Sequence, residues 1–380
     1  MESNFYSAFD YKKPLSLYIH IPLCNAKCDY CAFYSEPKGK NGKSAIYAYV
    51  MQICEQISHV SSLMDRPFYT AFIGGGNPGC LDVNDLASIC EAVCTNGRPL
   101  EFTTEINPES LTPGHEVLFE RYLNRMSMGV QSLDSRALKY MGRNVTLEQT
   151  RAGIELACSI KKNTGCRLSF DMITCLPSFH KPVEDIRNLM DTCTVQPEHL
   201  SIYALTPEEG TAFYNRLESG KAESLPDSDE QADILQNIWD FMEGKGYGHY
   251  EVSNFAKPGF ESLHNSVYWN YGQYMGLGPS SHSRAFKDGT VTAFEIHGNI
   301  HSQTVESTVL TKEQALEEFV LMGLRHREGL DLERLENEFG YSLEKLKDRI
   351  PAGYSIKNGR LVPDDRGLMT SDAAALDILH

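Results

Sequence analysis

Three closely spaced cysteines carry the clearest chemistry in this sequence. Cys24, Cys28 and Cys31 have the spacing C-x3-C-x2-C and directly follow an apolar, alternating run at residues 15–21. A structural zinc site needs four ligands, and no fourth Cys or His lies in the next turn or two of chain. A [4Fe-4S] cluster usually has four thiolates, so three leave one iron open to a substrate or cofactor. The spacing favours such a cluster, with bound zinc or three buried cysteines as alternatives.

Glycines and a carboxylate follow two of the next apolar runs. The segment GGGNP at residues 74–78 has no Cβ at three positions, so its backbone can approach another group closely. A plain tight turn explains the same residues. Glu105 closes the run at 101–105, where a carboxylate can bind a cationic amine or cap a helix.

Three further polar residues are candidates for ligand binding. Gln131 and Arg143 follow the run at 125–128 and are suited to a ribose and a carboxylate, although a lone Arg also forms surface ion pairs. Asp171 lies inside the apolar run 168–173, and a buried carboxylate needs a partner or a ligand.

A histidine in an aromatic segment is a candidate haem ligand. His264 belongs to SLHNSVYW at residues 262–269, and a neutral imidazole beside a flat apolar wall can bind haem iron. A hydrogen-bonded structural histidine fits the pattern equally well. His249 and His282 compete for the same role.

Apolar runs alternate with helical patterns six times. The runs are residues 15–21, 68–73, 101–105, 125–128, 167–173 and 199–203. The first helical pattern places Ile46, Val50, Ile53, Ile57 and Val60 on one face. This alternation predicts a parallel α/β sheet with right-handed crossovers, and six units indicate a partial (β/α)6 barrel. Five of the candidates fall at the carboxyl ends of the runs or just beyond, where such folds carry their chemistry: Cys24, the glycines at 74–76, Glu105, Gln131 and Asp171.

The rest of the chain divides by pattern. We expect a lead-in at 1–14, the barrel at 15–206, a barrel extension and haem-binding region at 207–310, and a small helical subdomain at 311–380. A long helix is predicted at 227–247 and a hairpin around Asn358-Gly359. The fold class is therefore α/β, a partial barrel with a C-terminal mixed or helical domain.

Composition excludes some partners. The 380 residues contain 35 Lys and Arg against 51 Asp and Glu, a net charge of −16, which disfavours nucleic acid and anionic lipid. Eleven cysteines, no signal segment and no apolar run near 18 residues predict a reducing, cytoplasmic location. That compartment also suits an oxygen-sensitive cluster.

The cysteine motif resembles the signature of the radical S-adenosylmethionine (SAM) enzymes, with Tyr30 before the last cysteine. Other segments are similar to the oxygen-independent coproporphyrinogen III oxidase superfamily and cover nearly the whole chain: YIHIP at 18–22, EINP at 105–108, GVQS at 129–132, YEVSNF at 250–255, HNSVYW at 264–269, GLGP at 276–279 and GLR at 323–325. The oxidases carry a fourth cysteine where this chain has Phe33. Phe33 and the His-Asn-x-x-Tyr-Trp motif are similar to the HemW branch of haem chaperones.

The resemblance implies roles for individual residues. It implies that the three cysteines hold the cluster and that SAM is bound by Tyr18, Tyr30, Gly75, Gly76, Asn77, Glu105, Gln131, Arg143 and Asp171. Asn77 departs from the usual Thr of the family, but an amide still forms hydrogen bonds.

The function expected from the resemblance is haem binding and delivery to acceptor haemoproteins, with haem near His264 and with the cluster and SAM controlling conformation. Peripheral contact with a membrane-bound acceptor and a homodimer are compatible with this function. The alternative is an active coproporphyrinogen III oxidase that decarboxylates propionates through a 5′-deoxyadenosyl radical. Phe33 weighs against that alternative.

Overall fold

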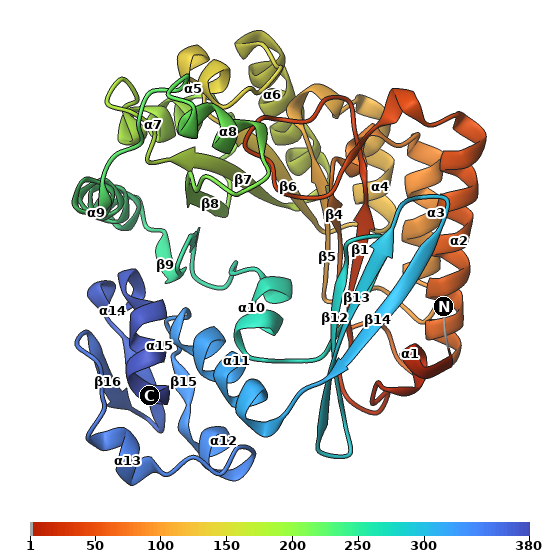
Figure 1. The fold of residues 1–380 in the computed structure, drawn as a ribbon. Coiled ribbons are helices and arrows are strands. Elements are labelled where there is room, and N and C mark those ends of the chain that lie inside the picture. Colours follow the sequence, from red (N-terminus) through yellow and green to blue (C-terminus); the bar gives the residue numbers. More distant parts are fainter. Residues whose placement is uncertain (1–2) are drawn as a thin grey trace.

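The computed structural model describes residues 3–380 and contains a mixed twelve-stranded sheet (Figure 1). The strand order is β14-β13-β12-β11-β1-β4-β5-β6-β7-β8-β10-β9. Six consecutive strands of this sheet pair in parallel: β1 (Ser16–Ile21), β4 (Thr70–Gly75), β5 (Glu101–Ile106), β6 (Arg125–Gln131), β7 (Arg167–Thr174) and β8 (His199–Ala204). The six predicted strands and the partial barrel are therefore confirmed.

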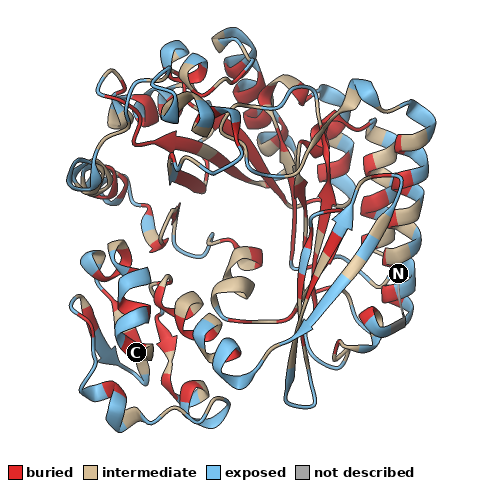
Figure 2. Cartoon of the chain, viewed as in Figure 1, coloured by how far each residue is buried: buried red, intermediate tan, exposed pale blue. Residues whose placement is uncertain are grey.

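Helices cover the outer face of these strands: α2 (Lys43–Ser62), α3 (Val83–Val93), α4 (Glu116–Arg121), α5 (Ser135–Tyr140), α6 (Leu147–Thr164) and α7 (Pro182–Thr192). The predicted stripe of α2 is buried from Ile46 to Val60. In β1, Leu17 and Ile19 are fully buried, whereas the alternate residues Tyr18 and His20 face the barrel interior. Figure 2 shows the resulting buried layer between strands and helices.

The chain beyond residue 207 extends both edges of the sheet. After α8 (Ala212–Glu218) and α9 (Ser228–Gly244), the chain forms β9 (Gly248–Glu251) and β10 (Asn254–Ala256). β10 pairs antiparallel with β8, and β9 pairs antiparallel with β10 at the edge of the sheet. After α10 (Leu263–Trp269), β11 (Tyr274–Leu277) pairs in parallel with β1. The antiparallel strands β12 (His282–Lys287), β13 (Thr290–Gly298) and β14 (Gln303–Val309) complete that edge. Three- and four-residue strands are too short to show a period, which explains why the sequence pattern did not reveal β9 to β11.

The lead-in packs tightly on the sheet. It forms α1 (Ser3–Ser7), and the rings of Phe5 and Phe9 lie 5.0 Å and 6.0 Å from the ring of Phe294 in β13. Two short strands, β2 (Leu23–Cys24) and β3 (Glu36–Pro37), pair in parallel and hold the ends of the cysteine loop together.

The C-terminal part has its own apolar core and mixes helices with a small sheet. Its elements are α11 (Lys312–Leu324), β15 (Leu330–Asp331), α12 (Leu332–Asn337), α13 (Leu343–Lys347), β16 (Tyr354–Lys357), β17 (Arg360–Pro363), α14 (Asp365–Met369) and α15 (Ser371–Leu379). The predicted hairpin is confirmed, since Asn358 and Gly359 both have positive φ between β16 and β17. Within residues 3–380 no helix is both long and apolar enough to cross a membrane.

Candidate functional site

The cysteine loop leaves the carboxyl end of β1 and lies at the mouth of the barrel. Cys24 ends β2, Cys28 and Cys31 follow on the loop, and all three side chains are half-buried. The Cys31 amide donates to the Cys28 carbonyl at 3.2 Å, which folds the two residues into one turn. In the described part of the chain, no three His, Cys, Asp or Glu side chains are placed to hold a metal ion as they stand. Cluster ligation by the three cysteines stays a prediction.

Two carboxylates meet inside the barrel beneath this loop. Burial raises the pKa of Glu105 to about 8, and the nearby negative charge of Asp171 adds to the shift. Burial also raises the pKa of Asp171, whose oxygens accept hydrogen bonds from Ser127 Oγ at 3.2 Å and 3.3 Å. A cationic ligand would relieve both the desolvation and the repulsion, so this pair is suited to an ammonium or sulfonium group.

The triple glycine is required by contacts within the protein. A Cβ on Gly74 would lie 2.9 Å from Glu105 Oε2, and one on Gly75 would lie 2.7 Å from the ring of His20. A Cβ on Gly76 would lie 2.6 Å from the Leu23 carbonyl oxygen. The Gly75 amide donates to Glu105 Oε2 at 3.1 Å, so the segment orients the carboxylate. The close approach expected from the sequence is thus made to β1 and to Glu105, whatever ligand also binds there.

Gly75→Ala is expected to lower the free energy of unfolding by about 2–4 kcal/mol, because Gly75 combines a φ of 109° with the overlap on His20. Gly165→Ala is the matched control, since that position has a φ of 73° and open space around it. Strain alone there costs about 1 kcal/mol. Urea denaturation of the two variants compares them, and equal losses would show that the contact with His20 is unimportant.

Other residues predicted to bind SAM lie near the same mouth. Gln131 has a φ of 69° at a bulge in β6, and its side chain makes no hydrogen bond to any described residue. Asn77 is buried, donating to Ser110 Oγ at 2.7 Å and accepting from the Asn107 amide at 3.2 Å, so its amide is already engaged.

Three residues link the mouth to the cysteine loop and the barrel interior. Arg143 is buried, with Nη1 3.7 Å from Cys28 Sγ and Nη2 donating to the Gly129 carbonyl at 2.8 Å, while its buried Nε has no partner in the described chain. Burial raises the pKa of Tyr30, and the neighbouring Cys28 adds to the shift. The Tyr18 hydroxyl lies 3.1 Å from His20 Nδ1.

His264 lies at the opposite end of the barrel and has no free nitrogen. Thr70 Oγ1 donates to Ser16 Oγ at 2.8 Å, so it accepts from His264 Nδ1 at 2.8 Å. The other nitrogen, Nε2, then accepts from the Tyr268 hydroxyl at 2.7 Å. Burial lowers the pKa of His264 to about 3, and its ring stacks on Phe72. The expected haem ligand is therefore a hydrogen-bonded structural histidine in this structure, because the lone pair that iron needs is occupied.

The two competing histidines differ in environment. His249 is packed against Phe255, with ring centroids 4.6 Å apart, and its Nε2 lies 3.3 Å from the Val252 carbonyl. His282 is exposed on β12.

A buried polar layer that sequence reasoning missed closes the lower end of the barrel. The six central strands all begin with a polar residue: Ser16, Thr70, Glu101, Arg125, Arg167 and His199. Glu101 is fully buried and accepts hydrogen bonds from the amides of Leu263 and His264 at the start of α10. This repeated polar start is the signal that identifies the layer. The layer fixes α10 beneath the strands.

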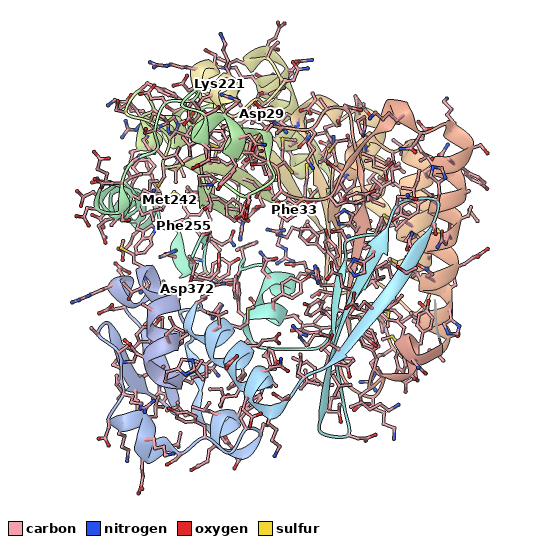
Figure 3. The ribbon with its side chains drawn as sticks, viewed as in Figure 1. Asp29, Phe33, Lys221, Met242, Phe255 and Asp372 are labelled. Carbon is pink, nitrogen blue, oxygen red and sulfur yellow. The ribbon has the colours of Figure 1, made fainter. Side chains whose placement is uncertain are left out.

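Phe33 stands where a fourth cysteine would follow the motif. Its side chain is 70% exposed beside the cysteine loop (Figure 3). It therefore supplies no thiolate and makes little contribution to the core.

The six-stranded partial barrel with a cysteine loop after its first strand defines a radical SAM protein. Residues 18–192 match the Radical SAM superfamily, and residues 310–375 match the HemN C-terminal domain. The solved structure of coproporphyrinogen III oxidase (HemN) from Escherichia coli superposes on this chain with a TM-score of 0.76 and a sequence identity of 19%. The match covers 100% of this chain and 93% of the HemN chain. At that identity the likeness concerns the fold.

Sequence relatives narrow the family. The heme chaperone HemW of Lactococcus lactis is 32% identical over 345 residues, which are 88% of both chains. The heme chaperone HemW of Escherichia coli is 33% identical over 286 residues, covering 73% of this chain and 72% of the relative. The chain belongs to the HemW family of radical SAM proteins, whose superfamily implies a [4Fe-4S] cluster and SAM as cofactors.

Proposed function

We propose that this protein is a haem chaperone that binds haem and delivers it to acceptor haemoproteins. The observation that carries the choice over an oxidase is the exposed phenyl ring of Phe33 at the position of the oxidases' fourth cysteine. Relatives named as heme chaperones, at about 30% identity over most of the chain, support the same choice.

The proposal includes a cluster held by Cys24, Cys28 and Cys31, with SAM bound beside it. When bound, the cluster supplies an open iron for the amino and carboxylate groups of SAM. The residues at the mouth suit this cofactor: Glu105 and Asp171 offer negative charge to a cation, and the unpaired Nε of Arg143 and the free amide of Gln131 offer hydrogen bonds. In a chaperone, these groups hold the loop in one conformation.

Haem transfer tests the chaperone proposal. Protein with a reconstituted cluster and one equivalent of haem is mixed anaerobically with an apo-haemoprotein, and the acceptor's absorption spectrum is followed. We expect the acceptor to gain haem faster than from free haem in the same buffer. Transfer no faster than from free haem would contradict delivery.

A second assay separates the oxidase alternative. The protein is incubated with SAM, a strong reductant and coproporphyrinogen III, and 5′-deoxyadenosine and porphyrinogen products are quantified by mass spectrometry. We expect no decarboxylated product. Product formed in step with 5′-deoxyadenosine would make the protein an oxidase despite Phe33.

A further inference from the structure

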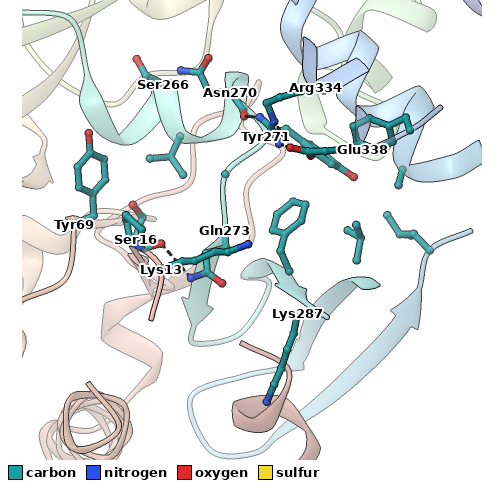
Figure 4. A pocket seen from close by; sticks show the side chains of 18 of the residues that line it. Lys13, Ser16, Tyr69, Ser266, Asn270, Tyr271, Gln273, Lys287, Arg334 and Glu338 are labelled. Carbon is teal, nitrogen blue, oxygen red and sulfur yellow. Dashed lines mark hydrogen bonds and ion pairs between the residues drawn. The ribbon is translucent and has the colours of Figure 1, made fainter. Parts of the chain in front are cut away.

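A large cavity lies beneath the barrel, lined by residues of α10 and by Ser16 of the polar layer (Figure 4). Its volume is about 1200 Å³, and its walls come from α10, β12, β13 and the C-terminal helices α11 and α12. Pockets for small ligands and cofactors usually measure about 300–1,000 Å³, so this one has room for a macrocycle. Apolar and aromatic side chains form much of the wall, including Leu263, Val267, Phe286, Val291, Ala315 and Phe339.

Cations at the rim distinguish this cavity from the acidic surface elsewhere. Lys13 and Lys312 line it, and the side-chain ammonium group of neither forms a hydrogen bond or ion pair with residues 3–380. The other lining cations are engaged: Lys287 donates to the Ser7 carbonyl, Arg327 pairs with Asp365, and Arg334 pairs with Glu338. The acids of the lining are Glu261, Asp288, Glu328 and Glu338. Two free ammonium groups beside an apolar wall suit a flat ligand with carboxylates at one edge.

One histidine lines the cavity. His326 is buried, and its ring meets Tyr250 edge-on with centroids 5.9 Å apart. Its backbone is braced because the Arg327 amide donates to the Tyr250 carbonyl at 2.8 Å and Glu251 pairs with His326 in an antiparallel bridge. The Nδ1 atom accepts a long hydrogen bond of 3.2 Å from the Glu328 amide, whereas Nε2 has no partner in the described chain.

We infer that this cavity is the haem site, with His326 Nε2 as the iron ligand and Lys13 and Lys312 as partners of the propionates. The inference rests on the proposed chaperone function and assigns that function a location. Ligation through Nε2 requires the ring proton to be on Nδ1. The long hydrogen bond that Nδ1 accepts from the Glu328 amide is therefore lost when iron binds. The HNSVYW segment still contributes, because α10 presents Leu263 and Val267 as cavity wall while His264 anchors its other side.

Haem titration of the full chain tests this site. The variants are His326→Ala, the double variant Lys13→Ala/Lys312→Ala, and the double control Lys162→Ala/Lys221→Ala. The control lysines are exposed, one on α6 and one in the loop after α8. Iron-free protoporphyrin IX serves as a second ligand. It has the same ring and propionates as haem, so it should depend on the cavity and the lysines, but it has no iron to bind an axial ligand. Circular dichroism checks that each variant folds.

We expect His326→Ala to shift the Soret band and weaken haem binding about tenfold or more, while protoporphyrin binding is unchanged. The double variant of Lys13 and Lys312 is expected to weaken the binding of both ligands about tenfold, and the double control is expected to change neither affinity. If the wild-type chain binds no haem, the proposed function itself fails. If the wild type binds haem but the His326 and rim variants match it in affinity and spectrum, the site is overturned and the chaperone proposal stands.

Discussion

Replacing Cys28 by alanine is expected to abolish cluster assembly. With Cys28 lost, two thiolates of the loop remain, which is too few for a cluster that already has one open iron. The fold should be retained, because the backbone turn of the loop uses the Cys28 carbonyl and the half-buried side chain gives up only its sulfur contact with Arg143 Nη1. After anaerobic reconstitution we expect iron and sulfide contents at background level, with an unchanged circular dichroism spectrum.

Cys54→Ala is the matched control for this experiment. Cys54 is also half-buried, but it lies on α2 and burial raises the pKa of its thiol to about 11. This variant should retain the iron and sulfide content of the wild type. A cluster that assembles normally in the Cys28 variant, or is lost in the Cys54 variant, would contradict the assignment of the three loop cysteines as the cluster ligands.

Replacing Glu101 by alanine is expected to produce the largest loss of stability. The fully buried carboxylate accepts hydrogen bonds from the Leu263 and His264 amides at 3.1 Å and 2.9 Å, and it pairs with Arg167 at 3.0 Å. Its removal leaves the two amides without an acceptor and the Arg167 guanidinium without its ion-pair partner. Breaking one partner of a buried ion pair costs about 3–5 kcal/mol, so we expect a loss of that size in urea denaturation.

Two comparisons sharpen the Glu101 prediction. Glu101→Gln keeps the shape and one acceptor oxygen, so its loss should be smaller than that of the alanine variant. Glu91→Ala, at an exposed position of α3, should change the free energy of unfolding by less than about 0.5 kcal/mol. Hydrogen exchange at the amides of Leu263 and His264 should accelerate in the alanine variant. A stability loss below about 1 kcal/mol would show that Glu101 does not anchor α10.

Local patterns were sufficient for the central barrel. The six parallel strands and the stripe on α2 follow from residues that are close in sequence and share one period. The structure also contains capping boxes at Thr146 and Thr311, which depend on residues only three positions apart. Such features can be predicted without knowledge of the rest of the fold, because the residues that interact are neighbours in the chain.

Pairings between distant segments were not predictable in this way. Strand β11 lies beside β1, although more than 250 residues separate them in the chain. The rings of Phe5 and Phe9 contact Phe294, and the strands β9, β10 and β11 have only three or four residues each, too few to show a pattern. These placements depend on which surfaces remain uncovered after the barrel has formed.

The sequence alone determined the family, the barrel and the three cysteines at its mouth, because these depend on spacing and period. Tertiary structure decided which histidine nitrogens have hydrogen-bond partners. His264 and His326 are both buried, but Thr70 and Tyr268 occupy both nitrogens of His264, whereas Nε2 of His326 is free at the wall of a cavity. A side chain's availability is set by what the fold packs against it, and those partners lie far away in the sequence.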